Sequence, residues 1–278
     1  MALCVGWRQD GGRHKLRPLF MHNQPSQSWN FHLLFALVER DFKAQYRRSM
    51  LGPLWAVLQP LMYMVIFTFL RSVLDIQTNG VPYVIFSFSA LVPWTFFANA
   101  ITRATPSVYI NGPIVKKMRV QAELFPLAAV ILSLLDFLIS FLILLAMMAW
   151  FATPLTAALL WLPVLILNAA LLALGLGLGS ASFGTFRRDI IFAIPFVLQF
   201  LMLATPIIYP LSKVPAHLHT LVALNPMVGV IEGFRAVIIH GAAPDLYLLS
   251  ISFVVTVLIW LVTWPLFRFV SGYYADAL

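Results

Sequence analysis

The sequence predicts an all-α protein that crosses a membrane several times. Of its 278 residues, 61% are hydrophobic and only 10% are charged, and the mean hydropathy is +0.90. A soluble domain has about 25% charged residues. A chain this apolar cannot cover itself with polar surface, so most of its surroundings must be lipid.

Six segments are long and apolar enough to span the hydrocarbon core, which takes about 20 residues as a helix. They cover approximately residues 54–74, 81–102, 124–150, 157–182, 190–211 and 246–267. An even number of spans puts both ends of the chain on one side of the membrane. We therefore expect six transmembrane helices, with residues 51–271 forming the membrane domain.

The basic residues indicate which side holds the two ends. Lys and Arg number eight before the first span, four between the second and third, two between the fourth and fifth, and one after the last, which leaves three for the other side. Cytoplasmic loops carry the excess of Lys and Arg in membrane proteins. We therefore expect residues 1–27 to be a cytoplasmic extension and residues 272–278 a cytoplasmic tail. The net charge of +8 is then a topology signal rather than a sign of nucleic-acid binding.

Residues 28–50 have the pattern of an amphipathic helix at the membrane surface. Apolar side chains recur every four positions along it: Leu34, Val38, Phe42 and Tyr46. Glu39 lies one turn before Lys43 and is well placed to pair with it. The sequence then changes from charged to apolar at residues 51–53. Such helices place cations against anionic headgroups, and a simple membrane anchor is an equally good interpretation.

The connection between the second and third predicted spans is too polar to lie in lipid, and it reads YINGPIVKKMRVQAELFP at residues 109–126. Asn111 or Gly112 can cap a short helix that Pro113 begins. The helix has an apolar side and a basic side, formed respectively by Ile114, Val115 and Met118 and by Lys116, Lys117 and Arg119. Apolar residues on an otherwise hydrated helix favour the docking of a protein partner over a solvated loop.

Between the fifth and sixth spans, the apolar stretches at residues 218–224 and 227–239 are too short to cross a membrane, and an Asn-Pro step separates them. We expect a re-entrant helical hairpin there, inserted from the outer face. Glu232 and Arg235 are spaced at i, i+3 and can neutralise each other within it.

The sequence offers few groups for catalysis. It contains no G-x-x-x-x-G-K-[ST] phosphate loop, its histidines lack the spacing of zinc ligands, and we expect no cofactor or metal on this chain. The glycine run GLGLGS at residues 175–180 favours close helix packing. Asp136 lies deep within the third span, where a structural hydrogen bond or helix contact is favoured over a proton relay, because a relay needs several ionisable groups.

Aromatic side chains gather in the first two predicted spans, and the candidates are Tyr63, Phe67, Tyr83, Phe88 and Trp94. Aromatic residues are common in belts at the two membrane interfaces. Their faces also stack on sugar rings, so they can guide a sugar polymer through a membrane protein. The belt interpretation is favoured on the sequence alone, and the second one stays open.

Five stretches of the sequence together carry a family pattern: RDFKAQYRRSMLGPLWAVLQPL, LVPWTFFANAITRATPSVYINGPIVKKM, FRRDI, ATPIIYP and LNPMVGVIEGFR. They resemble the type-2 ABC exporter permeases that move polysaccharides, in particular O-antigen permeases, followed by capsule and teichoic-acid permeases. The resemblance runs from about residue 33 to the C terminus. One departure is KKMRVQAELFP, because the family has an aromatic-proline pair sooner after the lysines.

This resemblance implies a homodimeric permease subunit, not itself an enzyme, in the bacterial inner membrane. Two separate ATPase subunits, which would carry ATP and Mg, would dock on the short helix through Asn111, Ile114, Val115, Lys116, Lys117, Met118 and Arg119. The substrate would be a polysaccharide on undecaprenyl diphosphate, and its head group would meet Arg47 and Arg48, with Arg40 as a weaker candidate.

Other functions remain open at this stage. The same type of permease can export another lipid, a drug, capsule or teichoic acid. A membrane enzyme or a passive channel would belong to different classes, and an ATPase that purifies with the chain would separate the exporters from both.

Overall fold

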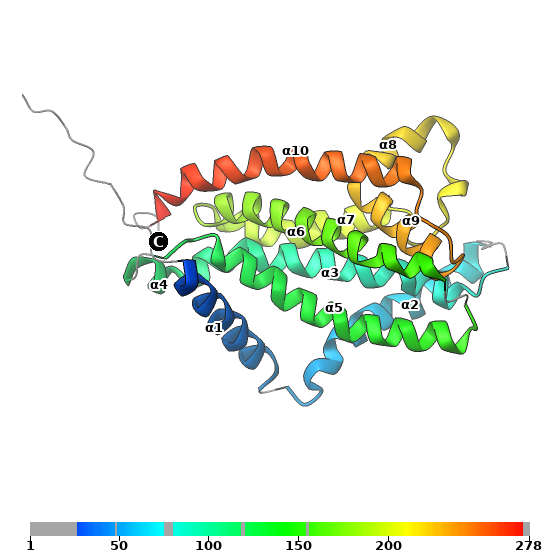
Figure 1. Cartoon of the computed structure of the whole chain (residues 1–278), viewed down its shortest axis with the longest axis horizontal. Helices are drawn as coiled ribbons and strands as arrows, with labels where there is room; N and C mark the ends of the chain where they lie inside the picture. The colour runs from blue at the N-terminus through cyan, green and yellow to red at the C-terminus, as the bar shows by residue number, and fades with distance from the viewer. Residues whose placement is uncertain (1–26, 48, 75–79, 118–119, 154–155, 275–278) are drawn as a thin grey trace, which may run out of the picture.

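The structure is a computed structural model that describes residues 27–47, 49–74, 80–117, 120–153 and 156–274. Within these residues the chain is all helical, with no strand. Most helices run along the long direction of one elongated bundle (Figure 1). The α-helices are α1 (Gln27–Tyr46), α2 (Trp55–Leu74), α3 (Tyr83–Ile110), α4 (Gly112–Lys117), α5 (Leu124–Trp150), α6 (Leu162–Gly184), α7 (Arg188–Ala204), α8 (His219–Ala223), α9 (Pro226–Ile238) and α10 (Leu246–Ser271). Short 3-10 turns are η1 (Gly52–Leu54), η2 (Ala157–Trp161), η3 (Leu211–Lys213) and η4 (Ala216–Leu218).

The central helix of the bundle is α3. It contacts α2, α5, α6, α7 and α9, and nearly every side chain from Tyr83 to Phe97 is buried. A helix that is apolar on all sides belongs in the middle of a large bundle. The main hydrophobic core therefore surrounds α3, and the other long helices form a layer around it.

Five helical segments among the described residues are long and apolar enough to cross a membrane: Gly52–Val73, Tyr83–Ile110, Leu124–Trp150, Ala157–Gly184 and Leu246–Ser271. The predicted count of six spans is not confirmed. The fifth predicted span, residues 190–211, contains the 17-residue helix α7, which ends at Ala204. The Thr205 hydroxyl donates back to the carbonyl of Leu201, and Pro206 has no N–H with which to continue the helix.

The second predicted span is longer than expected. We placed its end at residue 102, but α3 continues to Ile110. Pro106 removes one N–H from the helix interior, and α3 nevertheless runs through it. Arg103 consequently belongs to a helix rather than to a connecting loop. The predictions for the other spans agree with α2, α5, α6 with η2, and α10 to within four residues.

Gly177 and Gly179 let α6 approach its neighbours closely. A Cβ atom on Gly177 would lie 2.8 Å from Cβ of Ala104 in α3, and one on Gly179 would lie 2.9 Å from Cγ2 of Thr263 in α10. Side chains at these positions would push the helices apart. The interpretation of the glycine run as a packing surface is confirmed.

The helices α8 and α9 lie at the end of the bundle opposite α4 (Figure 1). As predicted, the chain breaks at Asn225, whose side chain accepts a hydrogen bond from the Met227 N–H and caps α9. The predicted ion pair between Glu232 and Arg235 is confirmed, with 2.7 Å between Oε1 and Nη1. Insertion of this hairpin into a membrane stays a prediction.

The first helix, α1, packs obliquely against α5 (Figure 1). Leu34, Leu37 and Val38 are buried in a cluster that includes Phe125 of α5, so the predicted apolar side of this helix is confirmed and faces protein. The helix ends at Tyr46, before the predicted boundary at residue 50. Its position at the membrane surface stays a prediction.

Candidate functional site

The predicted docking segment is the short helix α4, which follows directly on α3. Asn111 is buried between the two helices, and its carbonyl accepts hydrogen bonds from the N–H groups of Ile114 and Val115. Those two side chains pack partly into the cluster beneath α1, whereas Lys116 and Lys117 are exposed. The predicted short helix with one apolar side and one basic side is therefore present.

A surface hollow of about 520 Å³ lies beside α4. Its lining residues are Tyr109, Ile110, Gly112, Pro113, Lys116 and Lys117. Ile110 is 65% exposed, so the segment presents apolar side chains and two cations to the same space. Met118 and Arg119, which we also predicted to take part in docking, lie outside the described residues.

Arg40 of α1 contacts the start of this segment. Its Nη2 donates to Oδ1 of Asn111 at 2.9 Å and lies 2.7 Å from Oδ1 of Asp41. The Asn111 amide in turn donates to the carbonyl of Ser107 at 2.8 Å. The structure thus brings together two predicted groups of residues, the head-group cation Arg40 and the docking residue Asn111.

The other cations of α1 are closer to solvent. Lys43 forms the predicted ion pair with Glu39, and the hydrogen bond from Lys43, followed by its charge, lowers the pKa of Glu39. Arg47 is exposed in the turn that ends α1. Arg48 lies outside the described residues.

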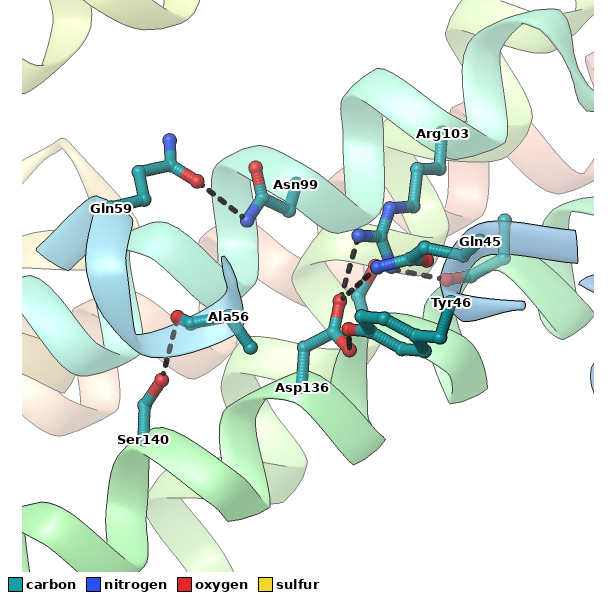
Figure 2. A network of polar contacts seen from close by, with 10 residues as sticks. Gln45, Tyr46, Ala56, Gln59, Asn99, Arg103, Asp136 and Ser140 are labelled. Atoms are coloured by element: carbon teal, nitrogen blue, oxygen red, sulfur yellow. Dashed lines mark hydrogen bonds and ion pairs between the residues drawn. The ribbon is translucent and has the colours of Figure 1, made fainter. Parts of the chain in front are cut away.

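Asp136 is the centre of a polar cluster between α1, α3 and α5 (Figure 2). Its Oδ2 lies 2.7 Å from Nη2 of Arg103, and its Oδ1 accepts a hydrogen bond from the phenol of Tyr46. Gln45 approaches at 3.4 Å. The sequence interpretation of Asp136 as a hydrogen-bonding and helix-contact residue is confirmed.

A cavity of about 350 Å³, with both polar and apolar lining, extends from Gln45 and Arg103 of this cluster toward the docking segment. Its polar lining comprises Arg40, Asp41, Gln45, Thr102, Arg103, Ser107 and Asn111. The two guanidinium groups each have a carboxylate partner, Asp41 for Arg40 and Asp136 for Arg103. The positive and negative charges around the cavity therefore balance.

Four of the five predicted aromatic residues, Phe67, Tyr83, Phe88 and Trp94, are at most 4% exposed and belong to the main core. Tyr63 is half-buried. Tyr63 and Trp94 line a cavity of about 190 Å³ between α2, α3 and α7.

The cavity that Tyr63 and Trp94 line also contains three side-chain amides, those of Gln59, Asn99 and Gln199. Asn99 donates to Gln59 at 3.2 Å (Figure 2). Aromatic faces and amides together are suited to sugar hydroxyl groups. Among the described residues, no group of three His, Cys, Asp or Glu side chains is arranged to hold a metal ion.

The sequence matches the family of ABC-2 type transporters over residues 32–239, which is most of the chain. The chain belongs to this family. It is 30% identical over 233 residues to the O-antigen export system permease protein RfbA of Myxococcus xanthus, covering 82% of this chain and 88% of the relative.

Two further relatives of this ABC-2 protein are more distant. An O-antigen export system permease protein RfbA of Klebsiella pneumoniae is 24% identical over 250 residues, covering 89% of this chain and 95% of the relative. The polysialic acid transport protein KpsM of Escherichia coli is 23% identical over 214 residues, covering 74% and 81%.

Two residues of this ABC-2 protein that sequence reasoning missed are Arg103 and Tyr46, the partners of Asp136. We counted Arg103 only as a cation for topology and Tyr46 only as part of an apolar row. The position of Arg103 could have indicated the ion pair, because this arginine directly follows the predicted end of a span at residue 102. A cation at that position is the natural counter-ion for a carboxylate inside the neighbouring span.

Proposed function

We propose that this ABC-2 protein is the membrane subunit of an ATP-driven exporter of lipid-linked polysaccharide, with O-antigen as the first candidate. The polymer is carried on undecaprenyl diphosphate and crosses the bacterial inner membrane from the cytoplasm. The observation that carries this proposal is the 30% identity to an O-antigen export permease over 82% of the chain. Capsule export is the second candidate, favoured by the relationship to the polysialic acid transport protein.

Six spans with both termini in the cytoplasm fit this function best. As a helix, α7 is about 25 Å long, and residues 205–210 add length toward the thickness of the hydrocarbon core, which is about 30 Å. The start of α1 and the end of α10 lie at the same end of the bundle as α4 (Figure 1). Among the described residues, Lys116 and Lys117 of α4 lie at that end, and the guanidinium of Arg188 lies 4.8 Å from the ring centre of Tyr109 in the last turn of α3.

Two copies of the chain assemble with two separate ATPase subunits. Each ATPase docks on α4, where exposed Lys116 and Lys117 stand beside the half-buried Ile114 and Val115. The second copy of the chain covers the open cavity between α2, α3 and α7. Its three amide side chains support this arrangement, because polar groups are costly against lipid, and the one hydrogen bond from Asn99 to Gln59 does not use all of their donors and acceptors.

Of the two candidates that line that cavity, the half-buried Tyr63 contacts the sugar rings, whereas Trp94 is 2% exposed and contributes at most an edge of its ring. The lipid diphosphate is held by Arg47 and Arg48 at the end of α1, since guanidinium groups form paired hydrogen bonds with phosphates. Arg40 contributes less than these two, because its guanidinium group already binds Asp41 and Asn111.

The test reverses the charge of the docking segment with Lys116→Glu and Lys117→Glu. We expect the double variant to lose its ATPase subunit on affinity purification and to stop exporting polymer. The matched control is Lys213→Glu, an exposed lysine at the opposite end of the bundle, which should do neither. Normal export by the double variant would remove α4 from ATPase docking.

A second measurement addresses the substrate. Cells that lack the chain should accumulate lipid-linked polymer in the cytoplasm, and analysis of the accumulated sugar distinguishes O-antigen from capsule. Accumulation of a lipid without a polymer would contradict polysaccharide export.

A further inference from the structure

A groove of about 460 Å³ runs along α10 where this helix packs on α6. Its lining residues on α10 recur every three to four positions from Phe253 to Pro265, so they form a stripe on one side of the helix. The stripe is about 18 Å long at 1.5 Å per residue, which is slightly more than half of a hydrocarbon core of about 30 Å. The groove therefore has approximately the length of one leaflet of the bilayer.

The polar groups that border the groove are paired within the protein. The indole N–H of Trp260 donates to the carbonyl of Leu171 at 2.8 Å. Its ring lies against Gly175, where a Cβ atom would be 3.1 Å from Cδ1 of Trp260. The Thr256 hydroxyl donates to the carbonyl of Ser252 at 2.8 Å. Because these groups are paired, the groove offers hydrocarbon surface and few partners for water.

A cation continues the stripe at one end of the groove. Arg268 follows Trp264 by four positions, and its guanidinium carbon lies 4.9 Å from the ring centre of Trp264. The rings of Trp260 and Trp264 stack, with 5.8 Å between their centres. The Arg268 side chain is 55% exposed, and its Nε pairs with Glu123 at 2.8 Å. A guanidinium group has two further nitrogens that can donate to a phosphate.

The position of this stripe places it against lipid. Most side chains of α10 are not buried in the bundle. Arg268 is in the last turn of α10, at the end of the bundle that holds α4, and α10 and α2 lie on opposite sides of the bundle (Figure 1). A second copy of the chain that covers the cavity beside α2 therefore leaves this groove open. Tryptophans are typical of the level at which a span meets the head groups.

We propose that the groove binds one acyl chain of an anionic glycerophospholipid, whose phosphate is held by Arg268. The lipid belongs to the leaflet at the α4 end of the bundle. A dry stripe of one-leaflet length with a cation at its end matches an apolar chain joined to an anionic head group. This site is separate from the path of the polymer, and the inference does not depend on which polymer is exported.

Fluorescence quenching by brominated lipids tests the site. The full-length protein is reconstituted into phosphatidylcholine vesicles with a small share of phosphatidylglycerol that carries bromine on its acyl chains. Bromine quenches tryptophan emission on contact. The emission of Trp264 is the difference between the unsubstituted protein and Trp264→Phe. Vesicles with the same share of brominated phosphatidylcholine measure unselective contact with the bilayer.

We expect half-maximal quenching of Trp264 at about threefold less brominated phosphatidylglycerol than brominated phosphatidylcholine, because one exposed arginine favours an anionic lipid. Arg268→Gln should remove this preference. If that variant does not fold, the comparison of the two lipids in the unsubstituted protein still tests the preference. Equal quenching by both lipids would indicate ordinary bilayer contact and overturn the proposal. So would an absence of quenching by either lipid, which would mean that protein covers the groove.

A pair of matched substitutions tests whether the chain lies in the groove. Val257 lines the groove, whereas Val262 is 67% exposed on the same helix and is not among the lining residues. Each is changed to Phe, with and without Trp264→Phe. Val257→Phe fills the groove and should weaken quenching of Trp264 by brominated phosphatidylglycerol, while Val262→Phe should leave it unchanged. Equal quenching in the two variants would place the acyl chain elsewhere.

A competitor distinguishes the phospholipid from the lipid carrier of the proposed polymer. Undecaprenyl phosphate, added at the same share as the brominated phosphatidylglycerol, should leave the quenching of Trp264 unchanged. Loss of quenching would assign the groove to the carrier lipid and overturn the proposal for a phospholipid.

Discussion

Two arginines inside the bundle, Arg235 and Arg103, are held in different ways. Arg235 of α9 is 3% exposed and donates to the backbone carbonyls of Pro206 at 2.6 Å and Ile207 at 2.8 Å. Its guanidinium also pairs with Glu232 and lies 3.8 Å from the ring centre of Phe86. Arg235 thus binds two successive carbonyls of the irregular segment that follows α7, and the phenol of Tyr83 binds a third, that of Ile208 at 2.9 Å.

Arg103 of α3 has partners of another kind. Its side chain is 28% exposed, its main partner is the side chain of Asp136 on α5, and a weaker contact at 3.4 Å reaches Ser133. A cavity adjoins it. A buried arginine bound to backbone carbonyls, such as Arg235, fixes the path of the chain. Arg103 instead binds side chains of a separate helix beside a cavity that can hold water. We call this contact between Arg103, Asp136 and Tyr46 the joint.

The largest expected effect is that of Arg235→Ala, which should prevent accumulation of folded protein. Two carbonyl groups and Glu232 would lose their partner at once, and removal of one member of a buried ion pair typically costs about 3–5 kcal/mol. Yield and melting temperature in detergent measure the loss. Arg235→Lys should recover it only in part, because an ammonium group lacks the fork that reaches two acceptors.

The exposed Lys213 provides the control for Arg235, and Lys213→Ala should leave yield and melting temperature unchanged. A stable Arg235→Ala protein would show that the segment after α7 keeps its shape without this side chain. The distinction between the two arginines would then fail.

A smaller effect is expected for Asp136→Ala. This change leaves Arg103 without its carboxylate and Tyr46 without its acceptor, but the guanidinium group borders a cavity and can bind water. We expect a loss of about 1–2 kcal/mol together with a larger fall in polymer exported per ATP hydrolysed. Asp136→Asn keeps an acceptor for Tyr46 and should retain more export than Asp136→Ala. If the two variants export equally, the hydrogen bond to Tyr46 has no part in transport.

Much of the fold could be predicted because its signals are local. Runs of apolar residues located five of the spans, and the i, i+3 spacing of Glu232 and Arg235 predicted their ion pair. The end of α7 could not be found in this way. Apolar residues continue through Ile207 and Ile208, while the backbone there is bound by Arg235, which lies 28 residues from Ile207 in the sequence.

In the candidate site, too, local features could be predicted from the sequence and contacts between distant residues could not. The docking segment was predictable from the order of residues around Asn111 and Pro113, which fixes a short helix. The joint at Asp136 was not, because Tyr46 lies 90 residues away and had an adequate explanation as part of an apolar row. A pattern that repeats every four residues indicates which side of a helix is apolar, but not which phenol in that row finds a carboxylate.

The smallest and most specific change is Tyr46→Phe, which removes one hydroxyl and keeps the ring against Phe42. We expect folding to be nearly unchanged, with a loss of about 1 kcal/mol at most, and export per ATP hydrolysed to fall. Tyr273→Phe is the matched control, because that tyrosine is exposed near the end of α10 and should export normally. Equal export by both variants would leave Tyr46 with a packing role alone.

The effect of Tyr46→Phe on export should also have a defined dependence on pH. Burial raises the pKa of Tyr46, and the hydrogen bond and charge of Asp136 raise it further. A raised pKa keeps the phenol protonated, so it remains a donor well above its ordinary pKa of about 10. The difference in export between Tyr46→Phe and the unsubstituted protein should therefore be constant from about pH 6 to pH 9. A difference that disappears as the pH rises within this range would mean that Tyr46 loses its proton there, and the phenol could not then be the donor that holds α1 to α5.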